Sequence, residues 1–180
     1  MELEDIRNIV TIGTGALTAI ALFISIRTFV KHKERYIQQK AYEWAINKVM
    51  EYLEHIEKSW RQSTKVHPYI GYLATRENND LKWSINEERE NSPDQMKNYD
   101  ELKSMLLDLY YFFNNNSNPL IAQAIDKEEL TKCFVLLDKY KPFTLQTFID
   151  LEKDKKFNNL HNDLLKIQSI VENSLAQKIK

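Results

Sequence analysis

Two side chains with the chemistry to cleave a phosphodiester lie close together in the chain. Arg61 and His67 are separated by five residues, and a second such pair, Arg27 and His32, is separated by four. An arginine stabilises the negative charge that develops on a phosphate, and a histidine transfers protons near neutral pH. One hypothesis for the chain is therefore RNA cleavage by Arg61 and His67.

This spacing resembles the R-x(4–6)-H signature of the HEPN-type helical ribonucleases. The resemblance implies an all-α body in which the arginine and the histidine act on RNA together. Pro68 directly follows His67. Because a residue before proline disfavours the α conformation, we expect His67 outside a helix, unlike the histidine of those enzymes. The HEPN-like ribonuclease is therefore an alternative, and enzymatic activity is not the leading hypothesis.

A carboxylate and an imidazole also share a helix face at Glu51 and His55. Such a pair can begin a metal site, but no second histidine follows at ligand spacing. A solvated helix face explains the cluster better. The lone Cys133 cannot form an internal disulfide or a cysteine-based zinc site, and three glycines are too few for a glycine-rich phosphate loop. We expect no metal and no cofactor.

The elements around these residues begin with an uncharged run. Residues 8–26, NIVTIGTGALTAIALFISI, carry no charge. As a helix they reach roughly 28 Å, close to the hydrocarbon thickness of roughly 30 Å, so we expect a transmembrane helix. A secretory signal peptide has a basic start, and an interfacial helix has a charged face. Neither feature is present, and a lone apolar run beside polar helices does not suit a buried core helix.

The charges that flank this run predict its orientation. Residues 1–7 contain a single basic side chain, whereas residues 27–35 contain a basic collar made of Arg27, Lys31, Lys33 and Arg35. By the positive-inside rule, residues 1–7 form a short extracytoplasmic tail and the collar is cytoplasmic, at the inner (plasma) membrane of the cell. The collar is expected to contact anionic lipid headgroups, at about 1 kcal/mol per charge.

Small residues recur every four positions within the expected span, at Thr11, Gly15 and Ala19. Small residues let two membrane helices approach closely, which indicates a homo-oligomer formed through this face. Glycine and threonine are also common in membrane helices in general.

Residues 36–180 are expected to form a cytosolic, all-α helical bundle. Apolar spacing predicts that the membrane helix continues to about residue 61, followed by a break over residues 63–80 because of Pro68 and Gly71. A helix should begin at Ser92–Pro93 and end at Asn114. A further helix should follow Asp126, and another should run from Thr144 with a kink at Asn158–Asn159.

The same patterns predict which side chains form the core. We expect Trp44, Trp60, Trp83, Tyr110, Phe113 and Cys133 to be buried, and His161 to lie on the surface. Tyr111 or Phe112 should face another element, a partner or the membrane. Lysine and arginine number 25 against 26 acidic residues. This balance argues against nucleic acid as a partner.

One stretch has a family resemblance. Residues 109–114 and 119–130, reading LYYFFN and PLIAQAIDKEEL, are similar to the central pattern of a family of small, uncharacterised bacterial proteins. Those proteins have one N-terminal span and a helical cytosolic domain. The resemblance implies a bacterial inner-membrane setting and no catalytic residues.

The leading hypothesis is a single-pass protein that acts by protein–protein contact, through recruitment of an unknown partner or through oligomerisation at the inner membrane. A second hypothesis is a membrane-permeabilising effector, such as a phage-defence protein, whose spans assemble when the body senses a trigger. The HEPN-like ribonuclease is the third.

Overall fold

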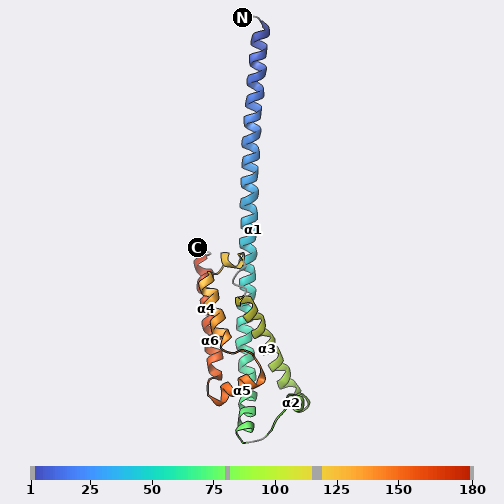
Figure 1. Ribbon diagram of the computed structural model, residues 1–180, viewed down its shortest axis with the longest axis vertical. Helices are drawn as coiled ribbons and strands as arrows, with labels where there is room; N and C mark the ends of the chain where they lie inside the picture. The colour runs from blue at the N-terminus through green and yellow to red at the C-terminus, as the bar shows by residue number, and fades with distance from the viewer. Residues whose placement is uncertain (1–2, 80–81, 115–118, 179–180) are drawn as a thin grey trace. The chain divides into compact units, whose positions relative to one another are not determined.

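The computed structural model describes residues 3–79, 82–114 and 119–178, and the side chains of these residues from position 21 onward. Over these ranges the chain is all-α, with six α-helices, one short 3-10 helix and no strand, as the sequence predicts (Figure 1). The elements are α1 (Leu3–Asn78), α2 (Ile85–Asn91), α3 (Pro93–Asn114), η1 (Ile121–Gln123), α4 (Lys127–Asp138), α5 (Leu145–Lys153) and α6 (Phe157–Lys178).

The chain divides into two compact units, Met1–Glu43 and Trp44–Lys180. The first unit contains the beginning of α1, and every side chain of residues 21–40 is exposed. The second unit contains a hydrophobic core to which the rest of α1 and helices α3 to α6 contribute.

Within the part of the chain that the structure describes, no helix combines the length and the apolar character that a membrane crossing needs. The side chains of residues 8–20, which make up most of the expected span 8–26, lie outside the described set. Thr11, Gly15 and Ala19 belong to this stretch. The transmembrane helix and its packing face therefore stay predictions.

The expected break over residues 63–80 is wrong, because α1 continues through Pro68 to Asn78. Proline inside a helix costs about 3 kcal/mol. The same stretch buries Val66, Ile70 and Leu73 completely. Each such side chain contributes about 1.5–3 kcal/mol, so burial outweighs the cost of the proline. As a result His67 lies within the helix and not outside it.

Helix α3 follows the sequence prediction closely. It begins at Pro93, the Met96 amide donates a hydrogen bond to the Ser92 carbonyl, and the helix ends at Asn114. The residues spaced along its apolar face are all buried, namely Tyr99, Leu102, Leu106, Leu109 and Phe113. Cys133 on α4 is buried as well, as expected.

The helical interruption in the C-terminal part of the chain lies before Asn158–Asn159, where the sequence predicts a kink. Helix α5 ends at Lys153, and α6 begins at Phe157, so Asn158–Asn159 lie inside a helix and no kink is needed there. Lys155 has a φ of 57°, and the Lys156 amide donates to the Leu151 carbonyl. A left-handed residue with such a back-bond is a common way to end a helix. Phe157 then enters the core at the start of α6.

Within the second unit, α4 and α6 run side by side (Figure 1). Helix α3 packs against α4 and contacts the later part of α1, where Gln62 donates a hydrogen bond to the Asn98 carbonyl and the Tyr52 ring stacks on Phe112.

The core prediction for the tryptophans is wrong at Trp44, which is 46% exposed. Ala45 and Val49 are the residues of this turn that reach the core. Trp60 and Trp83 are half-buried and pack against the core.

Candidate functional site

A pocket of about 310 Å³ lies in the second unit between α1, α3 and η1. We refer to it as the aromatic pocket. Its lining combines four aromatic rings with an isoleucine, a lysine and an aspartate: Trp44, Lys48, Tyr52, Asp108, Tyr111, Phe112 and Ile121.

Helical spacing brings the rings of the aromatic pocket together. Trp44, Lys48 and Tyr52 follow one another every four residues along α1, which places them on one face. The run Tyr110–Phe113 on α3 divides in two: Tyr110 and Phe113 are buried, whereas Tyr111 is 63% exposed. Phe112 is half-buried. The sequence predicts this division, since four consecutive aromatic residues cannot all face the core of one bundle.

Two stacked aromatic rings form one side of the pocket, and the Lys48 ammonium lies near them. The rings of Tyr52 and Phe112 stack with centroids 3.7 Å apart. The Lys48 ammonium lies 5.4 Å from the Tyr52 ring centroid and donates to the Glu51 carboxylate at 2.7 Å. The Glu51 hydrogen bond raises the pKa of Lys48, so this cation stays charged at neutral pH. An arrangement of this kind binds apolar or aromatic groups and orients them by nearby charge.

Only part of this site is predictable from the sequence. The sequence pattern predicts an outward-facing Tyr111 or Phe112 but assigns Trp44 to the core. Spacing alone could not place Trp44: it follows Val30 and Ile37 at intervals of seven, and only the structure shows that these residues are exposed.

The structure does not bring the suggested nuclease pair together. The Arg61 guanidinium pairs with Glu57 on the helix surface, where the arginine side chain is 67% exposed. Nε2 of His67 lies 3.0 Å from Oε2 of Glu152 on α5. Residues six positions apart on a helix differ by roughly 120° in direction, so Arg61 and His67 face different surroundings.

His67 belongs instead to a cluster with Glu152 and His161. The two imidazole rings have centroids 5.6 Å apart, and Nε2 of His161 is buried without a hydrogen-bond partner among the described residues. Burial lowers the pKa of His161, although a hydrogen bond with the Ser63 backbone opposes this. His161 is half-buried, so the predicted surface position is right only in part: α6 places its ring against α1. No local pattern links residues so distant in sequence.

Metal-binding residues do not converge in the described part of the chain, where no three His, Cys, Asp or Glu side chains are placed to hold an ion. The Glu51 carboxylate binds Lys48. Nδ1 of His55 is buried without a partner in the same part of the chain.

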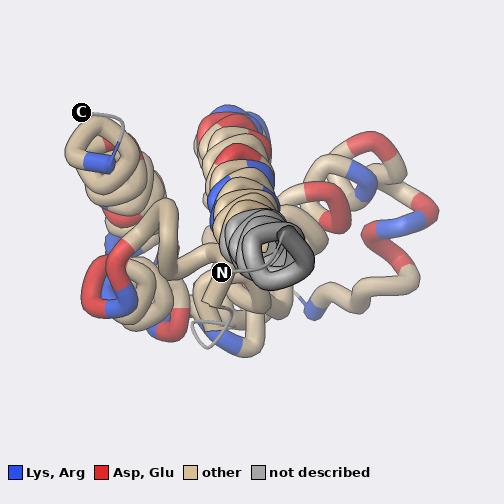
Figure 2. The backbone as a smooth tube through the Cα atoms, turned by 90° about the horizontal axis from the view of Figure 1, so that it is seen from above, with Lys and Arg blue, Asp and Glu red and all other residues tan. Residues whose placement is uncertain are grey.

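The basic collar lies in the first unit. Arg27, Lys31, Lys33 and Arg35 are exposed, and none of them has an ion-pair partner among the described residues. In the second unit, by contrast, basic and acidic residues are interspersed along the helices (Figure 2).

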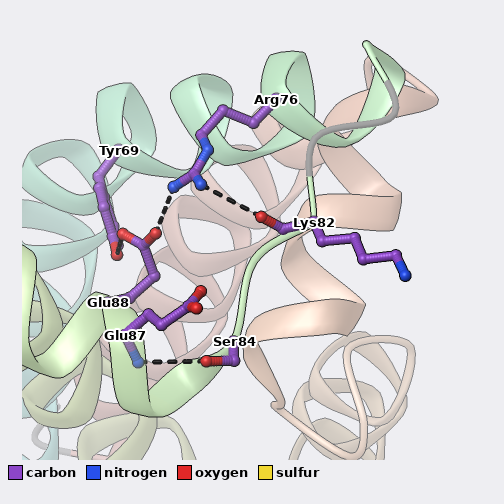
Figure 3. Close-up of polar contacts among 6 residues, drawn as sticks. All are labelled: Tyr69, Arg76, Lys82, Ser84, Glu87 and Glu88. Carbon is purple, nitrogen blue, oxygen red and sulfur yellow. Dashed lines mark hydrogen bonds and ion pairs between the residues drawn. The ribbon is translucent and has the colours of Figure 1, made fainter.

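A buried ion pair holds α2 against α1 (Figure 3). Glu88 is 1% exposed, accepts a hydrogen bond from the Tyr69 hydroxyl at 2.8 Å, and pairs with Arg76. Arg76 also donates to the Lys82 carbonyl at 3.2 Å. Burial, and then the Glu88 contact, raise the pKa of Tyr69 above its ordinary value. This cluster is internally satisfied, which suits a structural role.

A second buried carboxylate, Asp163, accepts hydrogen bonds from Lys139, Tyr140 and Lys166. Burial alone raises the pKa of Asp163, but these three bonds outweigh it and the pKa falls below its ordinary value. Asp163 joins α6 to the end of α4 in the same way that Glu88 joins α2 to α1.

Comparison with known proteins gives no relative: no family model matches the chain, and neither a curated protein nor a solved structure is significantly similar to it. The resemblance of residues 109–130 to small bacterial membrane proteins therefore stays a prediction.

Proposed function

We propose that this protein is a membrane-anchored helical adaptor that binds a segment of a partner protein in the aromatic pocket. The observation that carries the proposal is the exposure of Trp44 and Tyr111, at 46% and 63%, beside the stacked rings of Tyr52 and Phe112. Tryptophan and tyrosine are enriched among the residues that dominate the energy of protein interfaces.

The size of the pocket supports a protein segment as its occupant. A volume of about 310 Å³ is at the lower end of the range of roughly 300–1,000 Å³ for small-molecule sites. Such a pocket suits one or two apolar side chains of a partner. The stack of Tyr52 on Phe112 orders two of the four rings before binding, which reduces the ordering entropy that binding costs.

The anchor in this proposal is the uncharged run 8–26, with residues 1–7 outside the cell and residues 36–180 in the cytoplasm. The collar, which has no ion-pair partner among the described residues, is available to anionic headgroups. Confinement to the membrane raises the effective concentration of the body toward partners on the same surface.

Photo-crosslinking in cells tests the pocket. A photoreactive phenylalanine at Tyr111 is compared with one at Leu165, which is 47% exposed and lies outside the pocket. We expect a discrete adduct from position 111 alone, and its loss in Trp44→Ala. The partner identified in the adduct should then bind the purified chain at least tenfold more weakly when Trp44 is alanine. Equal adducts at both positions, or binding unchanged by Trp44→Ala, would contradict the proposal.

Fractionation tests the anchor. The intact chain should stay with membranes through alkaline extraction, and Leu17→Arg should release it, because an arginine at the centre of a span costs about 3 kcal/mol. Val135→Arg, at an exposed position of α4, is the matched control and should stay with the membrane.

The two other hypotheses have direct tests. Arg61→Ala and His67→Ala should each abolish RNA cleavage if the ribonuclease hypothesis holds. Dye leakage from expressing cells, abolished by Gly15→Leu, would support the permeabilising effector. The separate surroundings of Arg61 and His67 do not favour the ribonuclease hypothesis.

A further inference from the structure

An apolar stripe runs along the exposed part of α1 in the first unit. Phe23, Val30 and Ile37 recur every seven residues and are 66%, 46% and 55% exposed. Residues seven apart lie nearly in line on a helix, since two turns take about 7.2 residues. Phe23 lies within the proposed anchor, where lipid can cover it, whereas Val30 and Ile37 lie beyond the anchor and indicate a surface that another molecule covers.

Two opposite charges flank the stripe. Counted at about 100° per residue, Lys33 lies roughly 50° to one side of the line through Val30 and Ile37, and Glu34 lies roughly 50° to the other side. Both are exposed, and neither has an ion-pair partner in the described part of the chain. Of the collar, Lys31 and Arg35 lie about 110° or more from the stripe, and Arg27 lies roughly 70° from the same line, on the Glu34 side and two turns before Glu34.

These unpaired charges differ from the others along α1. Lys40 pairs with Glu43 at 2.9 Å, Lys48 with Glu51 at 2.7 Å, and Lys58 with Glu54 at 3.6 Å. Lys33 and Glu34 are adjacent in sequence, so they point in directions about 100° apart and do not face each other within one helix. Lys33 has no acidic residue one turn away on α1, and Glu34 does not pair with Lys31, so a second chain can supply an opposite charge to both.

We infer that the stripe binds the same stripe of a second copy of this chain, with the two helices parallel. In a parallel pair related by a two-fold axis, the Lys33 side of one helix meets the Glu34 side of the other at nearly the same height. Two ion pairs then border the apolar seam. An antiparallel pair centred at the height of Lys33 and Glu34 would hold like charges on each side of the seam, which disfavours that arrangement.

The parallel direction agrees with the proposed membrane anchor, on which this part of the inference rests. Every copy inserted in the same membrane has the same orientation. By sequence position, Ala19 precedes Ile37 by about five helical turns, so this residue of the small-residue face expected in the span is in line with the stripe, and Gly15 lies roughly 40° from that line.

Disulfide crosslinking of the full chain in membranes tests the seam. In a Cys133→Ala background, Ile37→Cys is compared with Gln39→Cys, which is also exposed but lies roughly 160° away around the helix. Mild oxidation should give at least fivefold more dimer from Ile37→Cys. Equal dimer yields, or more dimer from Gln39→Cys, would overturn the inference.

Charge reversal tests the flanking pairs. In the Ile37→Cys background, Lys33→Glu and Glu34→Lys should each lower the dimer yield several-fold, since each places like charges across the seam. The double variant should restore the yield to within about twofold. A double variant as weak as the single ones would overturn the parallel arrangement. An effect of net charge on lipid binding would move the dimer yields of the two single variants in opposite directions, so a loss in both of them reports the contact across the seam.

Fractionation of the same samples separates this inference from the proposed function. Loss of the Ile37→Cys preference in chains that remain in the membrane overturns the second-copy contact and leaves the anchor. Chains that leave the membrane but keep the preference overturn the anchor and retain the contact.

Discussion

Helix α1 carries similar apolar residues along two stretches whose surroundings differ. From Ala45 to Leu73 its apolar side chains include Ile56, Val66 and Ile70, all fully buried in the core of the second unit. From Leu22 to Ile37 the large apolar side chains are 46–68% exposed. The comparison teaches that helical periodicity specifies where an apolar face lies, whereas the surface that covers this face depends on the rest of the chain or on another molecule.

The charges of the two stretches differ in the same way. Beyond Lys40, most charged side chains of α1 are bound by a neighbour one turn away, as in the pairs Lys48–Glu51 and Arg61–Glu57. Between Arg27 and Arg35, the charged side chains have no ion-pair partner among the described residues. Residues 27–37 therefore present both exposed apolar side chains and charges without an ion-pair partner among the described residues.

The largest expected effect comes from a matched pair of substitutions in α1. Ile70→Ala should lower the free energy of unfolding by about 2–5 kcal/mol, since Ile70 is fully buried and its removal leaves a cavity. Ile37→Ala, at a residue that is 55% exposed, should change it by less than about 0.5 kcal/mol. Urea unfolding of the full chain in detergent, at low protein concentration, measures both. Equal losses would contradict the difference between the two stretches.

The next effect concerns the ion pair that closes α2 onto α1. Glu88→Ala leaves Arg76 and Tyr69 without their acceptor and should cost about 3 kcal/mol. Tyr69→Phe removes one hydrogen bond and should cost about 1 kcal/mol. Both values come from the same unfolding experiment. A cost for Glu88→Ala below that for Tyr69→Phe would show that the pair does not hold α2.

A smaller effect should appear as a dependence of stability on pH. Because burial lowers the pKa of His161 below its ordinary value of 6.5, the folded chain binds this proton less readily than the unfolded chain does. The stabilisation is complete above pH 6.5 and is lost as the pH falls toward the lowered value. His161→Gln should reduce this slope, measured by unfolding from pH 7.5 to 5. His32→Gln, at an exposed position of the first unit, is the control and should leave the slope unchanged.

The smallest effect is expected for ion pairs on the surface of α1. Arg61→Ala breaks the pair with Glu57 and should change the free energy of unfolding by less than about 1 kcal/mol, because exposed pairs contribute little. A larger loss would mean that the Arg61 side chain has a structural role beyond this pair.

Local signals predicted much of the secondary structure. The Ser92–Pro93 start, the apolar spacing from Tyr99 to Phe113 and the asparagines from residue 114 onward predict α3 at both ends. Such signals act between residues within one or two turns, so they are readable without knowledge of the fold. The same reasoning failed at Pro68, where the local preference against helix is opposed by the burial of Val66, Ile70 and Leu73.

The candidate site shows the same limit. The sequence by itself determined that this chain is helical, that four aromatic residues follow one another on α3, and that basic residues follow an uncharged run. Only the tertiary structure decided that Trp44 and Tyr52 of α1 meet Phe112 and Tyr111 in one pocket, and that His161 lies against His67. The physical reason is that helix formation and capping depend on neighbours in sequence, whereas burial and pocket formation depend on contacts between residues far apart in the chain.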